Sequence, residues 1–144
     1  MKLSPPRLLH LVLAVASAAL PAVASAQASS FDGAWSVTLG CPPHGGDDDA
    51  KGYTHRFAGE VLDGQMRAVH GKEGEPGWHL VTGRIAADGS ATLQVDGIVN
   101  NEKYAINNAQ RGKAYKYKVK AQFDTASGSG ERLTGRVCHF SFAR

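Results

Sequence analysis

The stretch YKYKVKAQF, residues 115–123, alternates strictly between apolar and polar side chains. Its five odd-numbered positions are aromatic or aliphatic, and three of its four even-numbered positions are lysines. Successive side chains of a β-strand point to opposite faces, so a strand would separate the two sets completely. A helix would scatter the lysines around its circumference. The stretch therefore predicts a strand with one face in a core and the other in solvent.

Less regular runs of the same kind recur along the chain, separated by Gly, Asp and Asn. Asp63-Gly64 and Asp88-Gly89 are dipeptides typical of hairpin turns. GSGE, residues 128–131, is interpreted as a flexible turn. About seven to eight strands at this spacing predict an all-β fold, either a small antiparallel barrel or a closed sandwich. The further strands are expected at 35–39, 53–61, 65–70, 79–86, 91–98 and 132–142.

The first 26 residues have the composition of an export signal. Two basic residues, Lys2 and Arg7, precede an apolar stretch over 8–20, and the small residues Ala24-Ser25-Ala26 form a cleavage signal. We therefore expect a signal peptide over 1–26 and a periplasmic or secreted protein. The alternative is an uncleaved membrane anchor, because 8–26 contains no Asp, Glu, Lys or Arg.

Cleavage at that point would leave residues 27–144, which suffice for a single domain with a substantial core. No later apolar stretch is long enough to cross a membrane. Removing Lys2 and Arg7 from the 16 basic residues leaves 14 against 13 acidic ones, a formal net charge of +1. A nearly neutral chain gives no general electrostatic reason to expect nucleic-acid binding. We expect a monomer that binds no nucleic acid.

The two cysteines, Cys41 and Cys138, are expected to form a disulfide, because exported proteins fold in oxidising compartments. The alternative is two buried free thiols. If the first and last strands pair antiparallel with the cysteines opposite each other, Leu39 faces Phe140 and Val37 faces Phe142. A slip of one residue would invert the faces, so this apolar match favours the register. The same register places Trp35 opposite Arg144, and pairing of these strands closes a barrel.

Two resemblances accompany this pattern. Gly33-Ala34-Trp35 at the start of the first strand, with Arg144 late in the chain, resembles the signature of lipocalins and related small barrels, the calycins. In that superfamily an arginine packs on the tryptophan. The wider pattern FDGAWSVTLGC … GYTHRFAGEV … DGSATL … GRVCHFSF is similar to small secreted β proteins of proteobacteria. Both resemblances imply the fold, and the second implies the compartment; neither implies an activity.

Few residues suggest catalytic or metal chemistry. Asp47-Asp48-Asp49 lacks the alternate spacing of calcium loops, so it is interpreted as a solvated acidic loop. The histidines form no metal-binding motif, although His55, His70 and His79 could converge across strands. No nucleophile motif is present. We expect no enzyme, cofactor or metal; a hydrolytic or metal-dependent enzyme with a site built across strands is the alternative.

The first functional hypothesis is a non-catalytic binding module that acts through loops at one end of the barrel. These loops are expected at 42–52, 72–78 and 100–112, and the partner could be a protein, as for a periplasmic inhibitor, or an envelope component. The alternative is a calycin-like carrier of a small apolar molecule inside the barrel. The number of inward aromatic residues predicts a filled interior, which disfavours the carrier. Candidate ligand contacts are Trp35, Phe57, Trp78, Tyr115 and Tyr117.

Overall fold

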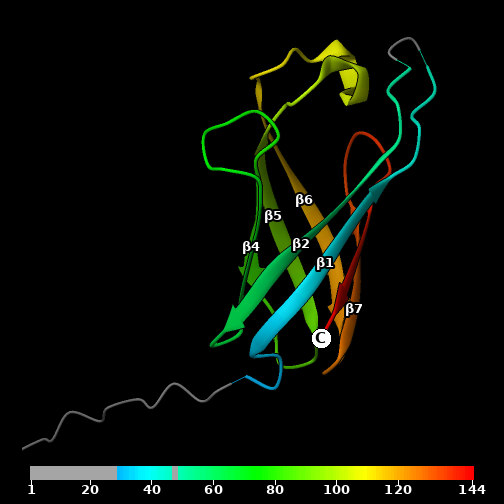
Figure 1. Ribbon diagram of the computed structural model, residues 1–144. Helices are drawn as coiled ribbons and strands as arrows, with labels where there is room; N and C mark the ends of the chain where they lie inside the picture. The colour runs from blue at the N-terminus through cyan, green and yellow to red at the C-terminus, as the bar shows by residue number, and fades with distance from the viewer. Residues whose placement is uncertain (1–28, 47–48) are drawn as a thin grey trace, which may run out of the picture.

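Eight antiparallel strands close into a barrel in the computed structural model, which describes residues 29–46 and 49–144 (Figure 1). Each strand is hydrogen-bonded to the next in sequence, and β8 returns to β1. The predicted all-β barrel is therefore confirmed, while the predicted signal peptide lies outside the described residues. The strands are β1 (Gly33–Cys41), β2 (Tyr53–Leu62), β3 (Gln65–His70), β4 (His79–Arg84), β5 (Ser90–Ile98), β6 (Ala114–Phe123), β7 (Ser127–Arg132) and β8 (His139–Ala143).

The alternating stretch behaves as its pattern predicts. In β6, the side chains of Tyr117, Val119, Ala121 and Phe123 are buried in the barrel, while the intervening polar residues are exposed. β6 pairs with β5 along its whole length and with β7 along its second half. Its three lysines therefore project from the outer wall of a closed sheet.

The closure between β1 and β8 has the predicted register. Leu39 pairs with Phe140 and Val37 with Phe142, and all four side chains are buried. A disulfide joins Cys41, at the end of β1, to Cys138, just before β8. The disulfide prediction is confirmed, and the covalent bond lies where the two strands reach the same end of the barrel.

The interpretation of residues 128–131 as a flexible turn is wrong, because they belong to β7. The inward positions of this strand are Gly128, Gly130 and Arg132, so it lacks the apolar alternation of its neighbours. A Cβ at Gly128 would lie 2.7 Å from Phe123 Cδ1, and one at Gly130 would lie 2.9 Å from Val119 Cγ1. Large side chains of β6 therefore occupy the space that β7 leaves. The predicted last strand, 132–142, is in fact the end of β7, a loop and β8.

One end of the barrel is closed by aromatic side chains. Trp35 packs edge-on against Phe123 with ring centroids 5.6 Å apart, and its indole Nε1 donates to the Phe31 carbonyl at 2.8 Å. The Arg144 guanidinium lies over the Trp35 ring at 5.4 Å and donates to the carbonyl of Thr125 at 2.9 Å. The predicted stacking of Arg144 on Trp35 is thus present, and this half of the barrel is filled.

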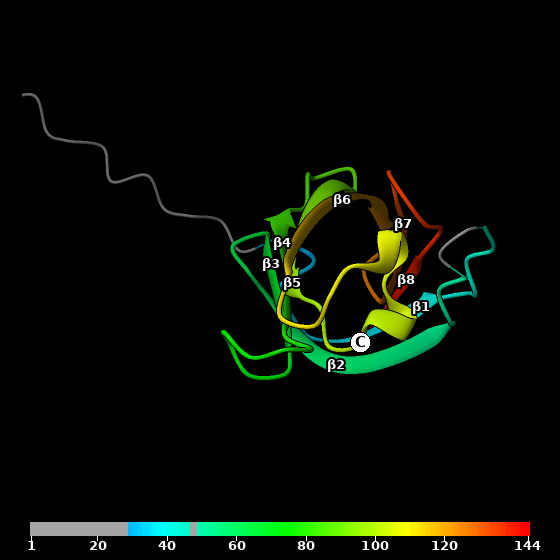
Figure 2. The same cartoon turned by 90° about the horizontal axis from the view of Figure 1, so that it is seen from above.

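The longer loops gather at the opposite end, which Figure 2 shows from above. The segment between β5 and β6 contains two short 3₁₀ turns, η1 (Glu102–Tyr104) and η2 (Ile106–Asn108), which lie over the barrel mouth. The loops between β1 and β2, β3 and β4, and β7 and β8 surround the same opening (Figure 1).

Candidate functional site

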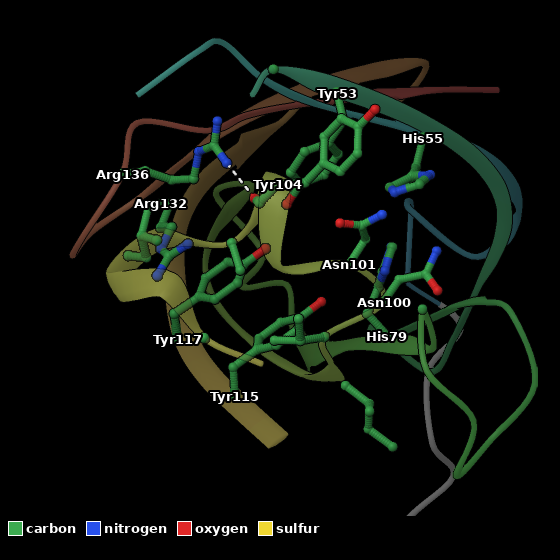
Figure 3. Close-up of a pocket in the computed structure, with 17 residues that line it drawn as sticks. Tyr53, His55, His79, Asn100, Asn101, Tyr104, Tyr115, Tyr117, Arg132 and Arg136 are labelled. Atoms are coloured by element: carbon green, nitrogen blue, oxygen red, sulfur yellow. Dashed lines mark hydrogen bonds between the residues drawn. The ribbon is translucent and has the colours of Figure 1, made fainter. Parts of the chain in front are cut away.

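A cavity of about 500 Å³ occupies the mouth of the barrel. Its walls come from β2, β4, β5, β6 and β7, and its roof comes from the segment that carries η1 and η2 (Figure 3). The expectation of a completely filled interior is therefore wrong: the aromatic residues fill the closed half and leave the loop end hollow. The lining residues are Gly52, Tyr53, His55, Gly77, His79, Ile98, Val99, Asn100, Asn101, Tyr104, Ala105, Ile106, Ala109, Tyr115, Tyr117, Arg132 and Arg136.

Four tyrosines supply most of the aromatic surface of the cavity. Tyr115 and Tyr117 lie on the inward face of β6 with nearly parallel rings, 6.0 Å between centroids. Gly97 pairs with Tyr115, and a Cβ there would lie 2.3 Å from the Tyr115 Cζ, so the tyrosine ring lies where a side chain of β5 would otherwise be. Tyr53 and Tyr104 pack edge to face beside each other, with ring centroids 6.3 Å apart.

The hydroxyl groups of the deep tyrosines stay protonated at neutral pH. Burial raises the pKa of Tyr115 and of Tyr117 far above the ordinary value, and it also raises the pKa of Tyr53. The nearby arginines oppose these shifts and do not cancel them. Tyr53, Tyr115 and Tyr117 therefore offer a ligand neutral rings and hydroxyl groups that can donate or accept hydrogen bonds.

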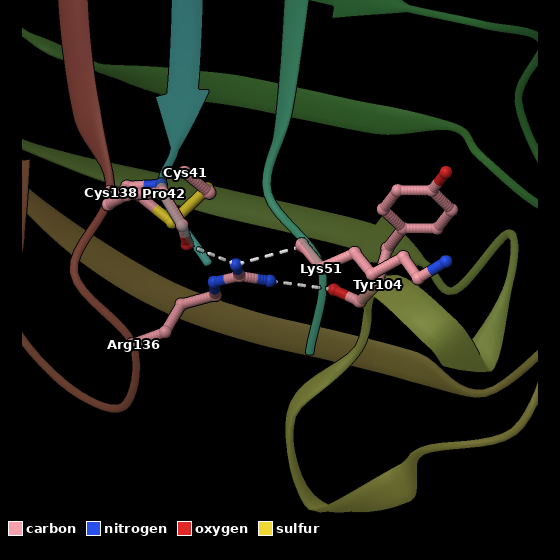
Figure 4. Close-up of a disulfide and its surroundings, with 6 residues drawn as sticks. All are labelled: Cys41, Pro42, Lys51, Tyr104, Arg136 and Cys138. Carbon is pink, nitrogen blue, oxygen red and sulfur yellow. Dashed lines mark hydrogen bonds between the residues drawn. A yellow bond between two sulfur atoms is a disulfide. The ribbon is translucent and has the colours of Figure 1, made fainter. Parts of the chain in front are cut away.

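Arg136 holds the loops together at the rim. Its buried guanidinium donates to the carbonyls of Tyr104 at 2.7 Å, of Lys51 at 3.1 Å and of Pro42, the residue that follows the disulfide (Figure 4). Three segments that are distant in sequence are thereby joined beside the cavity. Arg136 also lies 5.3 Å from the Tyr53 ring centroid, so it stiffens both the roof and the wall.

Arg132 is the last residue of β7 and lies on the inward face of that strand. Its guanidinium carbon lies 4.1 Å from the centroid of the Tyr117 ring, a cation–π contact. Its Nε is buried and has no hydrogen-bond partner among the described residues. None of the ion pairs among those residues includes Arg132. The positive charge thus faces the cavity without a carboxylate from this part of the chain.

Three histidines converge on the opposite side. The ring centroids of His55 and His70 are 4.2 Å apart, and His70 stacks on His79 at 4.7 Å. Burial, followed by the charges of His70 and His55, lowers the pKa of His79 to about 3, and burial also lowers the pKa of His55. His79 is therefore neutral, and its buried Nε2 has no hydrogen-bond partner among the described residues.

The sequence left open whether these three histidines lie close together. Their rings pack against one another in the structure. The His70 and His79 rings are stacked, the His55 ring is tilted by 43° to that of His70, and no group of three His, Cys, Asp or Glu side chains that could hold a metal ion occurs within residues 29–46 and 49–144. Of the acidic run at 47–49, Asp49 is exposed in the loop after β1, and Asp47 and Asp48 lie outside the described residues.

The predicted ligand contacts separate into two groups. Tyr115 and Tyr117 line the cavity. Phe57 lies beside it and packs edge-on against His79 at 4.8 Å between centroids. Trp35 belongs to the closed end, and Trp78 is half-buried in the loop before β4 without lining the cavity. Each of the three predicted loops contributes residues to the lining of the cavity, as do two of the five predicted aromatic contacts.

Sequence reasoning missed both arginines and the asparagines of the roof. Arg132 was counted as the start of a strand, and Arg136 as part of the same strand. Neither arginine carries a local signal in the sequence, because Glu131 directly precedes Arg132, and the contacts of Arg136 come from residues distant in sequence. Asn100 and Asn101 were assigned correctly to a loop, and they line the cavity.

Comparison with known proteins identifies no relative: no family model, no curated protein and no solved structure matches this chain. No helix among the described residues has the length and apolar character needed to cross a membrane. The assignment of this chain therefore rests on its own fold, an eight-stranded antiparallel barrel closed by the Cys41–Cys138 disulfide.

Proposed function

We propose that this protein is an exported, non-catalytic binding protein that holds a small molecule in the mouth of its barrel. The observation that carries this proposal is the cavity of about 500 Å³, which has aromatic walls and a rim of loops. Ligand sites of proteins are typically concave, mostly apolar and of this size, with a few polar groups that orient the ligand. The proposal keeps the loop end as the functional end and replaces a macromolecular partner by a small one.

The architecture around the cavity supports this role. The disulfide and the Arg136 contacts hold the rim, so the cavity does not depend on the ligand for its shape. Rigid strands that support loops are a common arrangement for binding sites. A preformed cavity lowers the entropy lost on binding, which favours a module that carries or captures a ligand. Export is supported by the leader-like residues 1–26 and by the disulfide, which persists in oxidising compartments.

Filling the cavity tests the proposal directly. Ala109 lines the cavity in the segment after η2, where its backbone is extended. An Ala109→Phe variant would place a ring in the ligand space without altering any strand. The matched control is Ala87→Phe, which adds the same ring at an exposed turn at the other end of the barrel.

The probe is N-phenyl-1-naphthylamine, a neutral aromatic compound whose fluorescence rises in apolar surroundings. We expect saturable binding of one equivalent to the wild type and to Ala87→Phe, and at least a tenfold weaker affinity for Ala109→Phe. Equal binding by all three proteins, or no saturable binding by the wild type, would contradict the proposed site. A native mass spectrum of the protein purified from its natural source would then identify the mass of any resident ligand.

A further inference from the structure

The charged side chains that line the cavity in the described part of the chain are all positive. Two arginines line it, and no Asp or Glu appears among the lining residues in the part of the chain that the structure describes. Burial raises the pKa of Tyr53, Tyr115 and Tyr117 and lowers that of His79, so these side chains are neutral at pH 7 and do not offset the guanidinium charges. An enclosed site of one sign concentrates ligands of the opposite sign. The cavity therefore favours an anion over a neutral molecule of the same shape.

The two arginines are not equivalent toward a ligand. Arg136 already donates to three backbone carbonyls, which makes it part of the rim. Arg132 contacts the Tyr117 ring face and lines the cavity from the end of β7. A guanidinium presents five donors in a planar fork that matches the oxygens of a carboxylate or sulfonate. Arg132 is thus the residue positioned to receive the charged end of a ligand.

The rest of the cavity suits the body of such a ligand. The Tyr115 and Tyr117 rings are parallel to within 11°, and the aliphatic residues Ile98 and Ile106 line the same cavity. Flat apolar groups can pack against such walls. Figure 3 shows Arg132 and His79 on opposite sides of the cavity, with Asn100 next to His79. Polar groups are therefore available at both ends of a long ligand, and only the Arg132 end is charged.

We propose that the ligand is an aromatic or other flat apolar molecule that carries one carboxylate or sulfonate group, and that Arg132 binds this group. The inference rests on the proposed function, because it names the class of ligand for the same cavity. It adds a specificity-determining residue and a chemical selection that the cavity volume alone does not give. Anionic compounds should bind more tightly than neutral compounds of the same skeleton.

Two probes differ only in the group in question. 1-Anilinonaphthalene-8-sulfonate has the skeleton of N-phenyl-1-naphthylamine with one added sulfonate. Fluorescence titrations would measure both probes on the wild type, Arg132→Gln and Arg132→Lys. The control is Arg56→Gln, which removes the same charge from the exposed face of β2. Near-ultraviolet circular dichroism and the urea midpoint would show that each variant is folded.

If Arg132 contacts the sulfonate directly, replacing Arg132 should lower the affinity for the anionic probe much more than the affinity for the neutral probe. We expect Arg132→Gln to weaken binding of the sulfonate about tenfold or more, as for other hydrogen bonds to charged groups, and to change binding of the neutral probe less than about threefold. Arg132→Lys should lose an intermediate factor, because it keeps the charge without the planar fork. Arg56→Gln should bind both probes as the wild type does.

The failures of the two proposals are distinguishable. If the neutral probe binds and Arg132→Gln weakens both probes equally, or neither, the assignment of Arg132 is wrong and the cavity remains a ligand site. The same conclusion would follow if Arg56→Gln and Arg132→Gln had equal effects, since general charge would then explain the result. If neither probe binds the wild type, both the proposed binding function and the proposed preference for anions are wrong. If Arg132→Gln does not fold, Arg132→Lys decides by the same comparison.

Discussion

The neutral state of buried His79 predicts that this protein loses stability on mild acidification. Burial and the charges of His70 and His55 lower its pKa to about 3, whereas an unfolded chain restores an ordinary value near 6.5. Between these two values the unfolded state binds a proton that the folded state does not bind. The free energy of unfolding therefore rises with pH in this window and falls as the pH decreases from about 6.5 toward 3.

The size of the effect follows from the same two values. Each pH unit below the unfolded pKa costs about 1.4 kcal/mol, so the free energy of unfolding should fall by about 2 kcal/mol between pH 7 and pH 5. His55, whose pKa is also lowered, acts in the same direction. Asp32 and Asp88 have lowered pKa values too, but carboxyl groups lose their contribution only as the pH falls through and below about 4. The change in the free energy of unfolding between pH 7 and pH 5 therefore reports on the histidines and not on these carboxyl groups.

Urea unfolding of the disulfide-bonded chain at pH 7, 6 and 5 would measure this dependence. A His79→Phe variant keeps a flat ring against Phe57 and should lose most of the slope. His139→Gln, which removes an exposed histidine from β8, should keep it. A wild type with the same free energy of unfolding at pH 5 and pH 7 would refute the reasoning, and so would a His79→Phe variant with the full wild-type slope.

Three further predictions concern residues that hold the barrel and its rim together. Replacing Cys41 and Cys138 by alanine should lower the free energy of unfolding by about 4–5 kcal/mol, because the bond closes a loop with a sequence separation of 97; urea unfolding of the double variant checks this. Arg136→Met should destabilise by roughly 3 kcal/mol, because it leaves three carbonyls without their donor, and hydrogen exchange should accelerate in the loops that it joins. Gly130→Val should destabilise by roughly 1–3 kcal/mol through overpacking against Val119, while Ser129→Val on the outward face of the same strand should change the urea midpoint little.

The features that the sequence predicted are those set by repeated local patterns. The apolar alternation of β6 and the matched apolar positions of β1 and β8 fixed the faces and the register, because an error of one residue would bury polar side chains. The disulfide was expected from the oxidising compartment of exported proteins, and placing Cys41 opposite Cys138 gave this register. Each of these inferences depends on residues that pack against their direct neighbours, which is information that a sequence carries.

The features that it missed depend on side chains from strands far apart. β7 was mistaken for a turn because Gly128 and Gly130 supply no apolar signal, and their function is to admit side chains of β6. Arg132 was overlooked because its inward direction follows from the phase of that strand. The cavity could not be predicted from the number of aromatic residues, since their distribution between the two ends of the barrel decides whether space remains.

The residues around the barrel mouth differ from what packing alone would favour, which supports the proposed binding function. His70, His79, Gly97 and Tyr115 are successive paired positions across β3, β4, β5 and β6, and they form one continuous row around the barrel wall. A row selected only for stability would contain apolar residues, as the next row does at Ala68, Val81 and Val95 before it reaches the cavity residue Tyr117. The actual row contains two imidazoles, a phenol and a glycine, and it leaves His79 Nε2 buried without a partner among the described residues. Natural proteins commonly accept such a loss of stability where a site needs polar groups, and the strands below this row supply the packing that offsets it.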